Sequence, residues 1–123
     1  MIDTLFGKKK QRLKEGRWKE YNKHAVLISV GHYLLGHKHG HWMEYYDTGE
    51  FMLEETYETG ILQGRFATYH PNGNLMSEGM YGLGSREGYF RIYNEVGTHT
   101  KSLLFIDNNL MEEIDETSTV NST

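Results

Sequence analysis

The most informative stretch of the sequence is GHWMEYYDTGEF, which spans residues 40–51. A related stretch, GRFATYHPNGNL, begins 24 residues later at Gly64. The glycine that opens both stretches also stands at Gly16 and Gly88, so four glycines follow one another at a spacing of 24. Self-similarity at a fixed period is typical of repeat architectures. The sequence therefore predicts four copies of one unit, at residues 16–39, 40–63, 64–87 and 88–111.

Aromatic residues occupy three columns of this 24-residue spacing. They follow each opening glycine by two, five and 17 residues. We expect them to form ladders across neighbouring strands on one face of a sheet and to present a partner-binding surface there. The twelve residues are Trp18, Tyr21, Tyr33, Trp42, Tyr45, Tyr57, Phe66, Tyr69, Tyr81, Phe90, Tyr93 and Phe105.

Each unit reads as two short strands and two turns. Phe51, Leu53 and Tyr57 keep a period of two, which is typical of a strand, and no comparable window shows the apolar spacing of a helix. Asn72-Gly73 is expected to close a hairpin through a primed turn, because both residues tolerate positive φ. The sequence predicts an all-β fold, a single elongated and twisted antiparallel meander of about eight strands.

The composition fits a single layer of sheet. The chain has 123 residues, 14 glycines, nine tyrosines, no cysteine and a net charge of −4. Without cysteine, disulfides and thiolate metal sites are excluded. We expect a cytoplasmic protein, because no apolar run reaches the ~20 residues of a membrane helix and the first residues lack the pattern of a secretory signal.

The spacing G-x-W-x-x-Y-x-x-x-G resembles the MORN repeat, and it is closer still to a variant found in bacterial proteins described as antitoxin-like. Residues 40–51 match best, and residues 64–75 match nearly as well. The resemblance implies an elongated twisted sheet used for protein contacts, and in some members for membrane-surface contacts or dimerisation. The first and last copies depart from the pattern at Ala25 and Asn108, as capping copies often do.

Both ends of the chain are charged. Residues 1–15 form a basic leader whose candidate lipid contacts are Lys8, Lys9, Lys10, Arg12 and Lys14. A solvated leader is the simpler interpretation, and the acidic net charge argues against nucleic acid. Residues 112–123 read as an acidic, mobile tail.

Catalytic and metal chemistry find little support. His37, His39 and His41 alternate and would share a strand face, where imidazoles can hold zinc or nickel, but solvated turn histidines are the favoured interpretation. Glu54 and Glu78 stand in one column, which indicates cross-strand hydrogen bonding or solvation rather than acid catalysis. We therefore expect no catalytic residue, no cofactor and no enzyme.

The sequence favours a non-catalytic protein–protein interaction module, and by the resemblance its partner would be a toxin that it neutralises. The alternative is a peripheral membrane or scaffold protein whose leader contacts anionic lipid. A homodimer would also cover the aromatic surface, since monomers rarely leave a large apolar patch bare.

Overall fold

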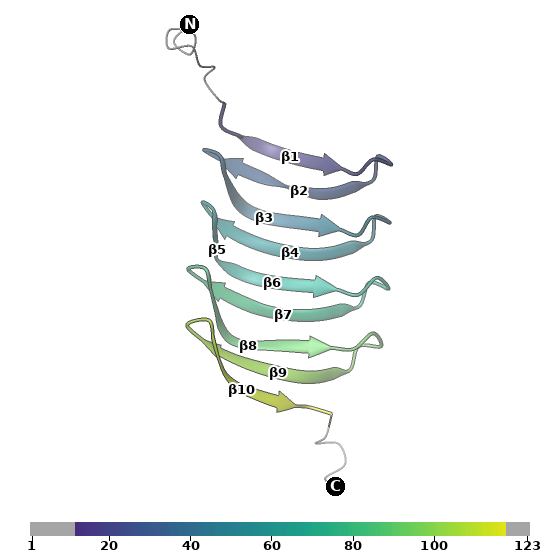
Figure 1. Ribbon diagram of the computed structural model, residues 1–123, viewed down its shortest axis with the longest axis vertical. Coiled ribbons are helices and arrows are strands. Elements are labelled where there is room, and N and C mark those ends of the chain that lie inside the picture. Colours follow the sequence, from purple (N-terminus) through teal and green to yellow (C-terminus); the bar gives the residue numbers. More distant parts are fainter. Residues whose placement is uncertain (1–11, 118–123) are drawn as a thin grey trace, which may run out of the picture.

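The computed structural model describes residues 12–117, which form one open antiparallel sheet of ten strands and contain no helix (Figure 1). Strands that follow one another in the chain are neighbours in the sheet, except that the short β5 pairs only with β4. The predicted all-β meander is confirmed, with two strands more than expected. The strands are β1 (Gly16–Tyr21), β2 (Leu27–Leu34), β3 (His37–Tyr45), β4 (Phe51–Glu58), β5 (Ile61–Leu62), β6 (Gly64–Tyr69), β7 (Leu75–Gly82), β8 (Ser85–Tyr93), β9 (His99–Ile106) and β10 (Asn109–Asp115).

The two additional strands arise from the residues that precede the opening glycines. These residues extend a strand backwards, so that β3 begins three residues before Gly40. Gln63 interrupts the same extension in the next unit and leaves β5 as a separate piece. The extension that follows the last unit is β10.

Strand β10 overturns part of the predicted mobile tail. The sequence predicts the tail from residue 112, but residues 112–115 pair with β9, with Glu113 opposite Leu103 and Ile114 opposite Ser102. An ion pair of 3.0 Å between Lys101 and Glu113 crosses the same two strands. Backbone pairing with β9 and this ion pair hold the segment in the sheet, where β10 is the edge strand. Residues 118–123 lie outside the described residues.

Two kinds of turn join the strands. The Gly73 amide donates to the His70 carbonyl at 2.8 Å, and Gly73 has φ +92° while Asn72 keeps negative φ. This geometry is a type I turn followed by a left-handed residue, so the primed turn predicted for Asn72-Gly73 is wrong. Two consecutive positive φ values, the mark of a type I′ turn, occur at the opposite end of the strands, as at Leu83 (49°) and Gly84 (85°).

The end of the basic leader contacts the turn after β2, although β1 begins only at Gly16. The Gly60 amide donates to the Lys38 carbonyl at 2.7 Å, and 24 residues earlier the Gly36 amide donates to the Lys14 carbonyl at 3.0 Å. Lys14 therefore occupies the place that Lys38 has in the next unit. The boundary at residue 15 does not separate this part of the leader from the array.

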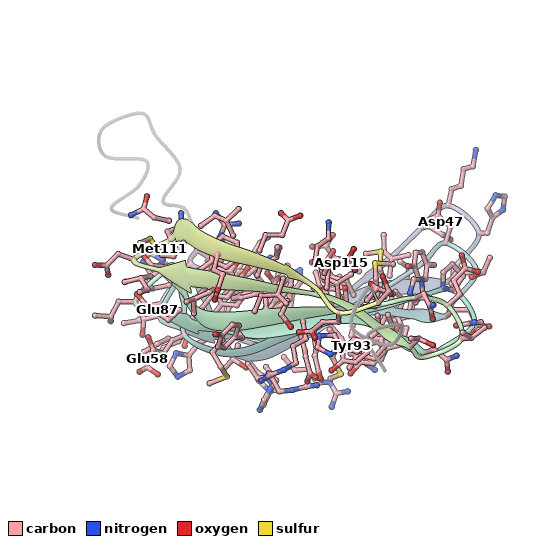
Figure 2. The ribbon with its side chains drawn as sticks, turned by 90° about the horizontal axis from the view of Figure 1, so that it is seen from below. Asp47, Glu58, Glu87, Tyr93, Met111 and Asp115 are labelled. Carbon is pink, nitrogen blue, oxygen red and sulfur yellow. The ribbon has the colours of Figure 1, made fainter. Side chains whose placement is uncertain are left out.

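The sheet is a single layer. Figure 2 shows side chains standing on both sides of the ribbon, with no further layer over either side within residues 12–117. Few described side chains are buried, and each is covered by neighbours on its own face. They are Val30, Trp42, Ala67, Phe90, Phe105 and Ser102.

Candidate functional site

One face of the sheet carries two of the three aromatic columns, and we call it the aromatic face. Its rings meet edge to face, with centroids 5.0 Å apart for Tyr33–Trp42 and 5.4 Å apart for Phe90–Phe105. Such pairs contribute beyond the area they bury. The residues of the aromatic face are Trp18, Tyr33, Trp42, Tyr57, Phe66, Tyr81, Phe90 and Phe105.

The remaining column, Tyr21, Tyr45, Tyr69 and Tyr93, lies on the opposite face, which we call the tyrosine face. Phe90 lies on Gly79, whereas the neighbouring Glu78 points the other way and accepts a hydrogen bond of 2.8 Å from the Tyr93 hydroxyl. The expectation that all twelve rings share one face is therefore wrong. The tyrosine column follows the column of Trp18 by three residues in the same strand. Because side chains alternate along a strand, these two columns point to opposite faces.

Two glycines let rings of the aromatic face lie flat on the backbone. A Cβ atom at Gly31 would stand 2.1 Å from the Trp42 ring, and one at Gly79 would stand 2.5 Å from the Phe90 ring. The Trp42 indole also donates a hydrogen bond of 3.0 Å to the His32 carbonyl. As a result, Trp42 is only 2% exposed, although no other element between residues 12 and 117 covers this face of the sheet.

Basic side chains lie over several of these rings. The Lys14 ammonium is 4.8 Å from the Trp18 ring centre, and the Lys38 ammonium is 4.7 Å from that of Trp42. The Arg86 guanidinium lies 4.2 Å from the Phe105 ring. These distances are within the range of cation–π attraction. The aromatic face thus already accommodates cationic groups.

A hollow of about 300 Å³ opens on the aromatic face beside Trp42, and we call it the acidic hollow. Three carboxylates reach it, and within residues 12–117 none of them has a hydrogen bond or an ion pair through its side chain. Lys38 is the single basic residue among those that line it. Its defining residues are Glu20, Tyr33, Lys38, Trp42, Glu44 and Asp47.

Glu55 adds a fourth carboxylate close to the acidic hollow. It stands opposite Trp42 in the sheet and accepts a hydrogen bond of 3.2 Å from the Tyr57 hydroxyl. Burial raises the pKa of Glu55, the Tyr57 hydrogen bond opposes that rise, the charge of Glu44 adds to it and Lys38 opposes it. Burial, together with the Glu55 carboxylate, also raises the pKa of Tyr57 to about 12. This part of the face therefore holds more negative charge than it neutralises.

The tyrosine face carries a more balanced polar network. Arg65 pairs with Glu54 and, at 3.4 Å, with Glu78. The Tyr69 hydroxyl donates to Glu54 at 3.2 Å, as Tyr93 does to Glu78. The predicted cross-strand hydrogen bonding of these two glutamates is confirmed. Because these ion pairs are partly exposed to solvent, they are expected to stabilise the fold only modestly.

The structure brings together a serine, a histidine and a glutamate that no pattern in the sequence links. Ser102 lies 2.8 Å from His99 Nε2 and donates to Glu116 at 2.9 Å. His99 Nε2 also lies 3.1 Å from the Lys101 carbonyl, which can only accept, so this nitrogen carries the proton. A protonated nitrogen cannot take the serine proton, and this arrangement does not activate a nucleophile.

The three histidines proposed for metal lie in β3 rather than in a turn. His39 Nδ1 accepts the Thr59 amide at 2.9 Å, and His41 Nδ1 lies 3.4 Å from the Thr56 hydroxyl. His37 lies beside Gly60. In the described part of the chain, no three His, Asp or Glu side chains are placed to share a metal ion.

The candidate lipid contacts are only partly placed. Lys8, Lys9 and Lys10 lie outside the described residues. Arg12 is exposed, while Lys14 directs its ammonium onto the rings of Trp18 and Tyr33. Lys14 is thus engaged by the aromatic face.

The comparisons with known proteins add no family. No protein-family model matches the chain, and no curated protein is similar to it in sequence. Between residues 12 and 117 there is no helix of the length and apolarity needed to cross a membrane.

Proposed function

We propose that the chain is a non-catalytic module that binds another protein through its aromatic face. The observation that carries the proposal is the series of ring contacts on a sheet face that no other described element covers. Tyrosine and tryptophan are enriched at the centres of protein interfaces because they combine large area with few rotamers. A rigid sheet also holds these rings in place before a partner arrives.

The resemblance to MORN-variant repeats supports a toxin as the partner, which this chain would neutralise by occupying its surface. A cytoplasmic location is part of the proposal, in keeping with a chain that has no cysteine for the disulfides of oxidising compartments.

Site-specific photocrosslinking tests the proposal. Tyr81 lies on the aromatic face, and the preceding Met80 lies on the tyrosine face and is 52% exposed. A benzophenone amino acid at position 81 should crosslink one discrete protein in cells, and the same group at position 80 should not. Crosslinking from position 80 alone would overturn the proposal. A product of twice the chain's mass would show a homodimer instead.

A further inference from the structure

We propose that the acidic hollow binds a lysine or arginine side chain of the partner protein. This inference rests on the proposed function and specifies the chemistry of the partner. The hollow combines a volume of about 300 Å³ with two ring walls, Tyr33 and Trp42, and the carboxylates of Glu20, Glu44 and Asp47. That volume is at the lower end of ligand-binding pockets, about 300–1,000 Å³, and suits a single side chain better than a large ligand.

The charge balance favours a cation. Among the residues that line the hollow, Glu20, Glu44 and Asp47 exceed the one basic residue, Lys38, by two negative charges; Lys14, which contacts Tyr33, is not part of this lining. Lys38 is already held by two rings, at 4.7 Å from Trp42 and 5.4 Å from Tyr57. The three carboxylates have no hydrogen bond or ion pair of their own among the described residues, which leaves them available to a second cation.

The chain's own contacts show that these rings accept cations. Lys14 lies 5.0 Å from Tyr33, and Lys38 lies over Trp42, so two walls of the hollow each contact an ammonium. A cation between rings and carboxylates gains from both. The matching positions in the rest of the sheet lack this combination. Glu20 and Glu44 stand in one column of the 24-residue spacing, and the next two units have Thr68 and Ile92 in that column.

Titration with a capped hexalysine peptide tests the inference by NMR. The chain has two tryptophans, and the Trp42 indole N–H, bonded to His32, is a distinct reporter at the hollow. The peptide should shift the signals of Trp42, Tyr33 and Glu44 at low salt, and added salt should weaken binding. The same peptide with every side chain acetylated should leave these signals unchanged.

Variants separate the hollow from general attraction between charges. Removing two charges with Glu20→Gln and Glu44→Gln should weaken hexalysine binding about tenfold or more, since about 1.4 kcal/mol is a factor of ten. Glu58→Gln, an exposed carboxylate at the end of β4, is the matched control and should change little. An equal loss in both, or binding of the acetylated peptide, would overturn the inference.

Three further outcomes are decisive. If the Trp42 signal shifts with protein concentration alone, a second copy of the chain fills the hollow and the inference fails. If hexalysine leaves the hollow unchanged while position 81 still crosslinks a partner, the inference fails and the proposed function stands. Loss of the crosslink alone would remove the proposed function instead.

Discussion

Strands β1–β4 and strands β6–β9 place aromatic rings at matching positions, but they surround these rings differently. In β1–β4, Trp18, Tyr33 and Trp42 contact one another beneath lysine ammonium groups. In β6–β9 the matching series, from Phe66 to Phe105, contains three phenylalanines and a tyrosine. The glycine and aromatic positions that recur every 24 residues give β1–β4 and β6–β9 the same backbone. The positions that do not recur determine which polar and charged groups each half of the sheet presents.

The largest expected effect comes from the most buried ring. Trp42→Ala should lower the free energy of unfolding by about 3–5 kcal/mol, because it opens a cavity over Gly31. Trp42→Phe gives the first half the ring that Phe90 supplies in the second, and it should cost about 1–2 kcal/mol, mainly through the lost hydrogen bond to His32. Urea denaturation followed by circular dichroism measures both. If Trp42→Phe lowers the free energy of unfolding as much as Trp42→Ala does, a phenylalanine ring cannot replace the indole at this position.

The glycines beneath the rings should be sensitive in both halves. Gly31→Ala and Gly79→Ala each place a methyl group inside the volume of a ring, and the required shift should cost about 1–3 kcal/mol. Gly82→Ala is the matched control, because its Cβ would meet only Glu87 at 3.5 Å. Gly31→Ala should cost much less in a Trp42→Ala background, where the ring is absent. If Gly31→Ala costs as much in the Trp42→Ala background as in the wild type, the clash with the Trp42 ring is not the cause of the destabilisation.

A smaller effect is expected at one position of the within-unit turn. Ala25 in the first unit and Gly73 in the third both have positive φ, 63° and 92°. Since a left-handed conformation costs a non-glycine residue about 1–2 kcal/mol, Ala25→Gly should stabilise the fold by up to about 1 kcal/mol and Gly73→Ala should destabilise it similarly. Thermal unfolding of the two variants checks the opposite signs. Changes of the same sign would mean that the two turns are not equivalent.

Much of the backbone could be predicted from the sequence, because glycine marks positions that other residues resist. The hairpins and the meander follow from the 24-residue spacing. The arrangement of the rings on two faces could also be predicted from the sequence, since an odd separation within one strand, as between Trp18 and Tyr21, reverses the face. The turn type could not be predicted, because Asn72-Gly73 is compatible with both a primed turn and a type I turn that is followed by a left-handed Gly73.

The sites depend on contacts that no local pattern encodes. The acidic hollow joins residues from β1, β2 and β3, and its carboxylates become a group only once the register is set. The Ser102 cluster requires Glu116, which follows β10, a strand whose residues 112–115 the sequence predicts as part of a mobile tail. Edge pairing of this kind depends on a neighbouring strand rather than on propensity.

The smallest expected effect distinguishes the halves by charge, because Glu55 lies opposite Trp42 where the matching residue opposite Phe90 is Leu103. Burial raises the pKa of Glu55 above its usual value of 4.5. The stability from its protonated form is therefore complete below pH 4.5 and is lost as the pH rises through the folded-state pKa. At pH 7 Glu55→Gln should stabilise the fold by less than about 1 kcal/mol, since partial exposure screens the charge, and the gain should shrink towards pH 4. Glu54→Gln is the matched control on the tyrosine face and should destabilise, because Glu54 pairs with Arg65. Urea denaturation across this pH range decides, and a gain that does not depend on pH would show that the ionisation of Glu55 is not its source.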